Sequence, residues 1–156
     1  MGKFVVLEGL DCAGKSTQLR EIAEALRSQG KKVVTAINPG ATPLGQKLRH
    51  LIKYENVHID PFTRSILFLA DNSAFINEIL LPALREDAIV LADRSNFISD
   101  YPYGTASGTA ENAILRMHQI LQNKPRIDKL FVFSMPWDKI LERLKNKNES
   151  KSKGLG

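Results

Sequence analysis

A short stretch near the N-terminus has the residue types and spacing of a phosphate-binding loop. Residues 9–16 match the pattern G-x-x-x-x-G-K-[ST] without a gap. Glycines let the backbone curl, so that successive N–H groups and the start of the next helix face one anion. Lys15 can then reach the β- and γ-phosphates of a nucleoside triphosphate, and the Ser16 hydroxyl can ligate Mg²⁺. The residues predicted to bind the triphosphate are Gly9, Asp11, Cys12, Ala13, Gly14, Lys15, Ser16 and Thr17.

A second pair of candidate residues follows an apolar run. Asp93 and Arg94 come directly after residues 88–92, which have the composition of a buried strand. Ligands of open α/β sheets gather at the carboxyl ends of strands. There the Asp93 carboxylate can hold Mg²⁺ or a substrate hydroxyl, and the Arg94 guanidinium suits phosphate oxygens. An acid–arginine pair is usually a surface ion pair, but this position favours a catalytic role in phosphoryl transfer for Lys15, Asp93 and Arg94.

Cys12 is the only cysteine of the chain and lies inside the loop. The positive potential of such a loop favours a thiolate, which leaves a redox or catalytic role open. No histidine or second cysteine stands in a position to support that role. We therefore interpret Cys12 as a small side chain that the loop tolerates.

Strand-like and helix-like patterns alternate along the chain, which predicts a mostly parallel sheet flanked by helices, a three-layer α/β fold. A helix starting at Asp60-Pro61 is expected to end or kink at Pro82. The last helix is expected to open at Pro136 and to turn Trp137 toward the core. The predicted strands are 4–7, 32–36, 88–92 and 130–133, and the other predicted helices lie around 19–26, 44–52 and 114–121.

Length and composition limit the classes of protein to which this chain can belong. The 156 residues suit one domain, and 43% hydrophobic with 25% charged residues is ordinary for a globular protein. No apolar run approaches the length of a membrane span, and no signal peptide precedes the first strand, so we expect a cytoplasmic protein without a membrane partner.

The net charge is +5, with six basic and two acidic residues from Lys139 onward. This C-terminal end is either a solvated tail or a segment that binds phosphate. Because the basic residues are concentrated there and not spread over one face, they argue against a nucleic-acid surface.

The chain resembles the thymidylate kinases, which are P-loop nucleoside monophosphate kinases. The resemblance rests on residues 4–18, 38–49, 66–84 and 90–99, whose order and spacing agree over essentially the whole length. It implies a P-loop NTPase fold and transfer of the ATP γ-phosphoryl group to a deoxynucleoside monophosphate, dTMP first, giving dTDP. It also implies Mg²⁺ as cofactor and a homodimer formed through the helices around residues 61–84 and 44–53.

The same resemblance implies roles for residues of the acceptor site. Asp11 matches a loop carboxylate near the acceptor sugar, and it is therefore predicted to be catalytic together with Lys15, Asp93 and Arg94. Arg49 and Arg94 match arginines near the acceptor phosphate, and Ser99 matches an acceptor-site serine. Phe68 matches the aromatic residue that stacks on the base, although its helical spacing fits a core residue equally well.

Several positions depart from the pattern of the family. Asn72 stands where an arginine is usual, and Tyr103 where a glutamine is common; both can still hydrogen-bond to a base edge. The chain has Ile37-Asn38-Pro39 where the family has Arg-Glu-Pro. The closing lid would begin near Lys145 and contain lysines only, so we expect a kinase core over 1–144 and a basic lid-like segment over 145–156. The family normally has a further strand and helix, so the chain is a minimal variant or a fragment.

Two other functions remain open at this point. A deoxynucleoside kinase has a similar acid-Arg-Ser triplet, as in Asp93-Arg94-Ser95, but would not need two arginines for an acceptor phosphate. A non-catalytic nucleotide-binding protein would fit the missing lid arginines, although Lys15 and Ser16 are retained. An assay with monophosphates and nucleosides separates the three.

Overall fold

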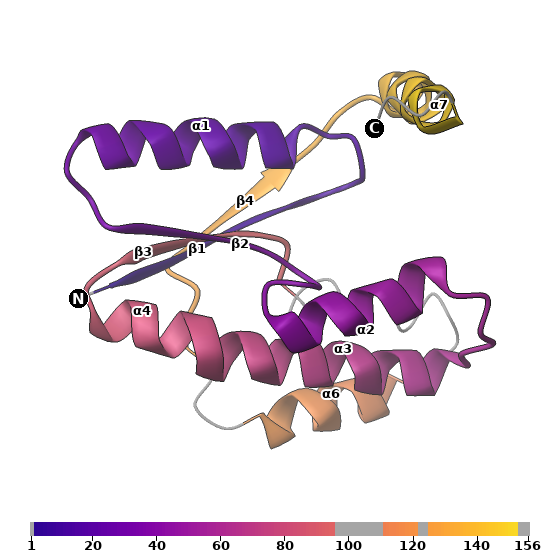
Figure 1. Ribbon diagram of the computed structural model, residues 1–156, viewed down its shortest axis with the longest axis horizontal. Coiled ribbons are helices and arrows are strands. Elements are labelled where there is room, and N and C mark those ends of the chain that lie inside the picture. The colour runs from indigo at the N-terminus through magenta and orange to yellow at the C-terminus, as the bar shows by residue number, and fades with distance from the viewer. Residues whose placement is uncertain (1, 96–110, 122–124, 153–156) are drawn as a thin grey trace.

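The computed structural model describes residues 2–95, 111–121 and 125–152 (Figure 1). Four described strands form one sheet in the order β2-β3-β1-β4. All three strand pairs are parallel, which confirms the predicted sheet. The strands are β1 (Lys3–Gly9), β2 (Val33–Ile37), β3 (Ile89–Asp93) and β4 (Lys129–Phe133).

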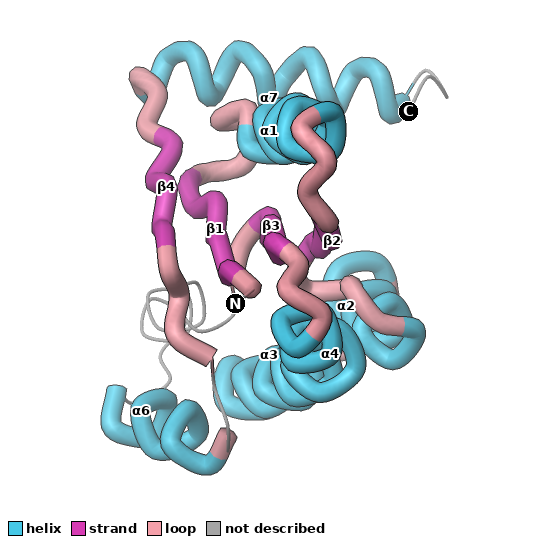
Figure 2. Tube along the Cα trace, turned by 90° about the vertical axis from the view of Figure 1, so that its left-hand side faces the viewer, coloured by secondary structure: helices cyan, strands magenta, loops and turns pink. Residues whose placement is uncertain are grey.

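Helices cover both faces of the sheet, as the strand–helix alternation predicts. Figures 1 and 2 show α1 and α7 on one side and α2, α3, α4 and α6 on the other. The chain therefore forms the three layers expected of an α/β domain. The helices are α1 (Lys15–Ser28), α2 (Pro43–Tyr54), α3 (Pro61–Phe75), the π-helical turn η1 (Ile76–Leu80), α4 (Leu81–Arg85), α6 (Glu111–Ile120) and α7 (Trp137–Ser152).

Local sequence signals explain where the helices begin. The Asp60 carboxylate accepts hydrogen bonds from the N–H groups of Phe62 and Thr63, at 3.0 and 3.1 Å, and so caps α3. Thr42 caps α2 in the same way, since its hydroxyl accepts from the Gly45 N–H at 2.9 Å. Both helices continue with proline in the first turn, where the absent N–H costs nothing.

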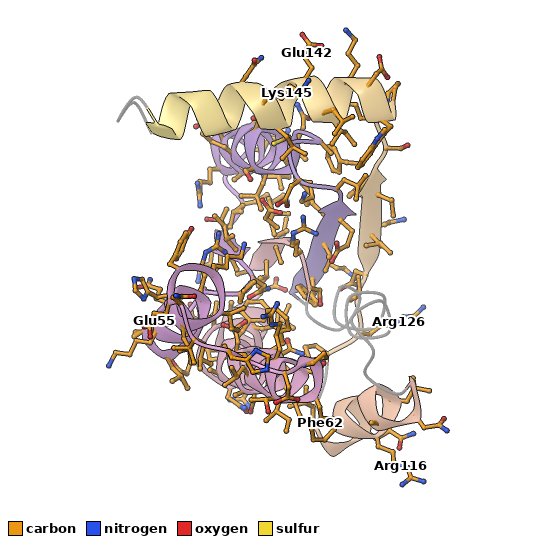
Figure 3. All side chains as sticks on the ribbon, turned by 90° about the vertical axis from the view of Figure 1, so that its right-hand side faces the viewer. Glu55, Phe62, Arg116, Arg126, Glu142 and Lys145 are labelled. Atoms are coloured by element: carbon orange, nitrogen blue, oxygen red, sulfur yellow. The ribbon has the colours of Figure 1, made fainter. Side chains whose placement is uncertain are left out.

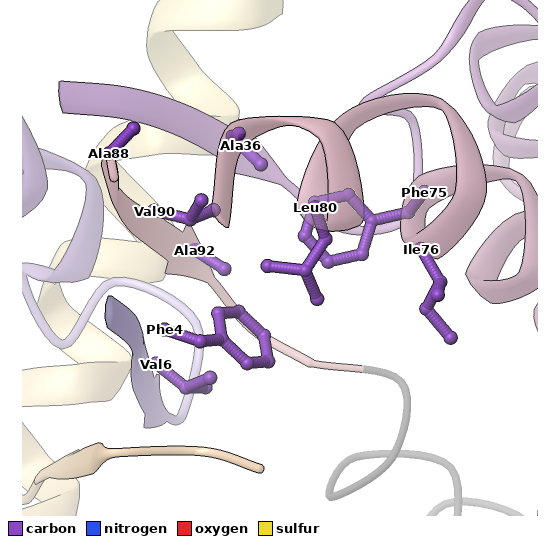
Figure 4. Packing of buried hydrophobic residues seen from close by; sticks show 10 residues of the cluster. Phe4, Val6, Ala36, Phe75, Ile76, Leu80, Ala88, Val90 and Ala92 are labelled. Carbon is purple, nitrogen blue, oxygen red and sulfur yellow. The ribbon is translucent and has the colours of Figure 1, made fainter. Parts of the chain in front are cut away.

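The main core lies between the sheet and the α3–α4 segment. Phe4 and Val90 from neighbouring strands lie close to Phe75 and Leu80 (Figure 4). The ring centroids of Phe4 and Phe75 are 6.1 Å apart, within the range of favourable aromatic pairs. Because β1 is central, its alternate side chains are buried on both faces of the sheet. On the α1 side the buried cluster consists of Leu7, Leu19, Ala23 and Leu91.

Two expectations about these helices need correction. An end of the helix at Pro82 is wrong, because the helical segment that begins at Pro61 continues to Arg85; the other expected outcome, a kink there, stays a prediction. The π-helical turn just before Pro82 bonds the Leu81 N–H to the Ile76 carbonyl, and this wider turn gives room for a residue without an N–H. Trp137 is 62% exposed rather than in the core, because α7 turns Ile140 inward instead.

Among the described residues, one helical segment, Pro61–Arg85, is long and apolar enough to cross a membrane by length and composition alone. Its inner side packs on the sheet through Phe75, Ile76 and Leu80. It also buries the polar side chains of Asp71 and Asn72. A core helix passes the same test, so this single segment is weak evidence for a membrane span.

Candidate active site

The predicted phosphate loop connects β1 to α1 at the carboxyl end of the sheet. Gly9, Cys12 and Gly14 have positive φ angles of 140°, 65° and 100°. At Gly9 an added Cβ would lie 2.4 Å from the Phe133 carbonyl oxygen of β4, so the close approach of the two strands requires glycine here. Gly14 is the residue from which α1 starts, as the motif requires.

Lys15 is buried beneath this loop. Its ammonium group donates to the carbonyl oxygens of Gly9 and Leu10, at 2.9 and 2.8 Å. Burial and the charge of Arg94 lower the pKa of Lys15, and the carboxylates of Asp93 and Asp11 partly oppose this. The lysine is thus fixed to the loop, and its predicted contact with the donor phosphates stays a prediction.

Ser16 and Asp93 meet beside the loop. The Ser16 hydroxyl donates to Asp93 Oδ2 at 2.5 Å, although 77 residues separate them in sequence. Parallel pairing of β1 with β3, in which Leu7 lies opposite Asp93, brings them together. A hydroxyl and a carboxylate are hard oxygen donors, and both line the same cavity, so the pair fits the predicted Mg²⁺ ligands.

Arg94 is held by two carboxylates. It has a positive φ of 73°, and its guanidinium donates to Asp11 Oδ1 at 2.5 Å and lies 3.7 Å from Glu8 Oε2. Partial burial would raise the pKa of Asp11, but the hydrogen bond and charge of Arg94 outweigh it and lower that pKa. Glu8 is buried and also accepts from the Ser95 N–H at 2.9 Å. Arg94 is therefore positioned, not free to sample solvent.

Arg49 approaches the same place from α2. Its guanidinium donates to the Pro39 carbonyl oxygen at 2.7 Å. The loop that contains Pro39 is itself fixed, because the Asn38 amide donates to the Arg94 carbonyl at 3.1 Å and Gly40 N–H donates to Asp71 Oδ1 at 3.0 Å. Buried Asp71, which sequence reasoning missed, thus helps to position an arginine of the site.

A cavity of about 360 Å³ joins these groups. Its lining includes the predicted triphosphate residues other than Gly9 and Ala13, together with Asp93. Cations from the phosphate loop, α2, the end of β3 and α7 converge on this space. No cluster of three His, Cys, Asp or Glu side chains suited to a metal occurs in residues 2–95, 111–121 and 125–152. The lining residues are Asp11, Cys12, Gly14, Lys15, Ser16, Thr17, Ile37, Asn38, Arg49, Lys53, Asp93, Arg94 and Arg143.

The predicted base-binding residues are not part of this cavity lining. Phe68 is partly buried in α3, and Asn72 is only 1% exposed. Within the described part of the chain, neither polar atom of the Asn72 side chain has a hydrogen-bond partner. Ser99 and Tyr103 lie outside the described residues. The grouping of these four residues into one base pocket stays a prediction.

Sequence reasoning missed three residues near the loop. Glu8 supports Arg94, and its signal was a lone carboxylate at the end of an apolar strand. Arg143 of α7 donates to the Cys12 carbonyl oxygen at 3.1 Å. Arg143 belongs to the basic end that starts at Lys139, but it lies outside the lid-like segment, which we expected to begin at Lys145. Lys53 lines the cavity from the last turn of α2, and its spacing from Arg49 was the available signal.

Comparisons with known proteins identify the family to which the chain is similar. The family model of thymidylate kinase matches residues 7–155. The thymidylate kinase of Thermosipho africanus is 34% identical over 145 residues, which are 93% of this chain and 72% of that protein. The thymidylate kinase of Caldicellulosiruptor saccharolyticus is 33% identical over 144 residues, 92% of this chain and 70% of that protein.

The same similarity holds for the fold. The crystal structure of thymidylate kinase from Ehrlichia chaffeensis matches with a TM-score of 0.77 at 23% identity, covering 99% of this chain and 89% of that one. This confirms the predicted P-loop α/β fold. With the family match over nearly all of the sequence, it follows that the chain belongs to the thymidylate kinase family.

Proposed function

We propose that this protein transfers the γ-phosphoryl group of ATP to dTMP, giving ADP and dTDP. The observation that carries the proposal is the single cavity that joins Lys15 of the phosphate loop to Arg49 and Arg94. A donor triphosphate on the loop and an acceptor phosphate beside the arginines would then meet in one space. Membership of the thymidylate kinase family supports dTMP as the acceptor.

The catalytic work of the chain is alignment and charge neutralisation, because phosphoryl transfer needs little covalent chemistry from a protein. Loop N–H groups and Lys15 would hold the donor phosphates. Arg94, oriented by Asp11, would bind the acceptor phosphate and offset the negative charge on the moving group. Arg143 supports a lid role for the basic end of the chain, since it already reaches the loop at Cys12.

Mg²⁺ belongs to this proposal as a cofactor. Ser16 and Asp93 would hold it, because their oxygens already converge at 2.5 Å beside the loop. When bound, the ion supplies positive charge to the phosphate oxygens. The protein's own part is to fix these two oxygens, one in the first turn of α1 and the other at the carboxyl end of β3.

For base recognition we propose Phe68 as the stacking residue and Asn72 as the polar reader, with Ser99 and Tyr103 completing the site. Asn72 supports this because its buried amide offers a donor and an acceptor, both without a partner in the described part of the chain. A pyrimidine edge presents the complementary pair. A buried amide left unpaired would cost free energy, so a ligand that satisfies it gains affinity.

Turnover of ATP with different acceptors tests the proposed function. We expect ADP release with dTMP, weaker release with dUMP and dCMP, and none above background with thymidine. Thymidine turnover without monophosphate turnover would contradict the proposal and favour a deoxynucleoside kinase. ATP binding without turnover of any acceptor would favour a non-catalytic protein. The relative rates of ADP release with dTMP, dUMP and dCMP also report on the base pocket that we propose around Asn72.

We further propose that the protein is a cytoplasmic homodimer. Phe62 and Ile66, one turn apart on α3, are 47% and 44% exposed, and Figure 3 shows Phe62 on the outside of the helix. Leu44 and Tyr54 of α2 are exposed as well, which makes these two helices a suitable apolar contact for a second copy. Sedimentation equilibrium is expected to give twice the chain mass at micromolar concentration, and a single-chain mass would contradict this.

A further inference from the structure

Lys53 is a cation of the active-site cavity that the motifs do not include. It lies in the last turn of α2, four residues after Arg49, so both side chains project from the same face of the helix. Both residues line the cavity together with Arg94 and Asp11. Lys53 therefore adds a further positive charge to the lining of this cavity.

The other cations of the cavity already have contacts within the protein. Arg49 donates to the Pro39 carbonyl, and Arg94 is paired with Asp11 and Glu8. In the part of the chain that the structure describes, Lys53 has no hydrogen bond or ion pair. It is thus the cavity cation that can accept an incoming anion without first breaking a contact.

The electrostatic surroundings agree with a place for an anion. Desolvation and the neighbouring guanidinium of Arg49 lower the pKa of Lys53, whereas Asp11 acts in the opposite direction. Two like charges side by side are unfavourable unless an anion lies between them. A dianionic phosphate in the cavity would relieve this repulsion.

We infer that Lys53 is a further binding residue for the phosphate of the acceptor nucleoside monophosphate, acting with Arg49 and Arg94. The inference rests on the proposed function and adds to it a residue from outside the recognised motifs. Because Lys53 has no internal partner, its contribution depends on the phosphate and not on the base. The alternative is that Lys53 only offsets the charge of Asp11 in the ligand-free protein.

Calorimetric binding tests this with four proteins: unmodified, Lys53→Met, Lys53→Arg and the control Lys47→Met. Lys47 lies on α2, is exposed and does not line the cavity. For dTMP we expect Lys53→Met to raise Kd about tenfold, the loss typical of one charge-assisted hydrogen bond. Lys53→Arg should stay within about threefold of the unmodified protein, and Lys47→Met within about twofold.

Thymidine, which has no phosphate, is the second probe. Its Kd should be unchanged by Lys53→Met if Lys53 binds the phosphate. The inference would be overturned if Lys53→Met weakened the binding of thymidine and of dTMP equally. It would also be overturned if Lys53→Met and Lys47→Met had the same Kd for dTMP. Absence of dTMP binding by the unmodified protein would also overturn it.

The same proteins test the proposed kinase activity independently of the role of Lys53. Unmodified protein that binds dTMP in a Lys53-dependent way but releases no ADP supports the role of Lys53 and rejects the kinase activity. Protein that releases ADP with dTMP, but whose Kd does not respond to Lys53→Met, rejects only the role of Lys53.

Discussion

Replacing Lys15 by alanine is expected to lower kcat with ATP and dTMP by about a hundred- to a thousandfold, the usual loss when one preorganised donor is removed from a transition state. Lys15 lies under the loop, where its ammonium group is buried and bonded to the loop carbonyls. Without it, charge that builds up on the phosphate oxygens would lack its main partner from the protein.

Folding should be much less affected by this change. Lys15 donates only to two loop carbonyls, and one of them belongs to Leu10, which is exposed and can bond to water instead. A loss of about 1 kcal/mol in the free energy of unfolding is therefore expected. ADP release and thermal unfolding measure the two effects. Lys31→Ala, an exposed lysine after α1, is the control and should keep kcat within about twofold. Near-normal turnover by Lys15→Ala would mean that the loop has another purpose.

Replacing Arg94 by methionine is expected to lower kcat/KM for dTMP by about a hundred- to a thousandfold, because one guanidinium would serve both acceptor binding and charge neutralisation. The variant should also lose about 1–3 kcal/mol of stability, since the buried Glu8 carboxylate would lose its cation. Steady-state kinetics and urea unfolding measure the two losses.

The stability loss should depend on pH in a defined direction. The folded protein holds the pKa of Asp11 below 3.8 through Arg94, so this pair stabilises the fold above about pH 4 and loses its effect as the pH falls through the folded pKa. The difference between the two proteins should thus be larger at pH 7 than at pH 3. Arg85→Met, at the exposed end of α4, is the control. An Arg94→Met protein with unchanged kcat/KM would remove Arg94 from the acceptor site.

The sequence predicted those parts of the site that depend on local pattern or on strand ends. The loop at residues 9–16 and the Asp60-Pro61 helix start need only neighbouring residues, and both are confirmed. Asp93 was predicted to lie beside the phosphate loop because it ends a buried strand, and its carboxylate does accept a hydrogen bond from Ser16 there.

Residues whose role depends on packing between distant elements could not be predicted in this way. Whether Trp137 or Ile140 faces inward depends on how α7 lies on the rest of the molecule, and the amphipathic pattern fitted both. Lys53 and Arg143 resemble any surface cation in the sequence. Only the folded arrangement brings them to the loop, because α2 and α7 approach the cavity from opposite sides of the sheet.

The close approach of Gly9 to Phe133 has a consequence for movement of α7. The helix begins four residues after Phe133, and its Arg143 reaches Cys12, so α7 is joined to the phosphate loop at two separate points. One joint is backbone against backbone within a sheet, and the other is a single exposed side-chain bond. Loss of the single Arg143 bond would therefore free the outer joint, while the pairing of β4 with β1 would still hold the strand that precedes α7 against Gly9.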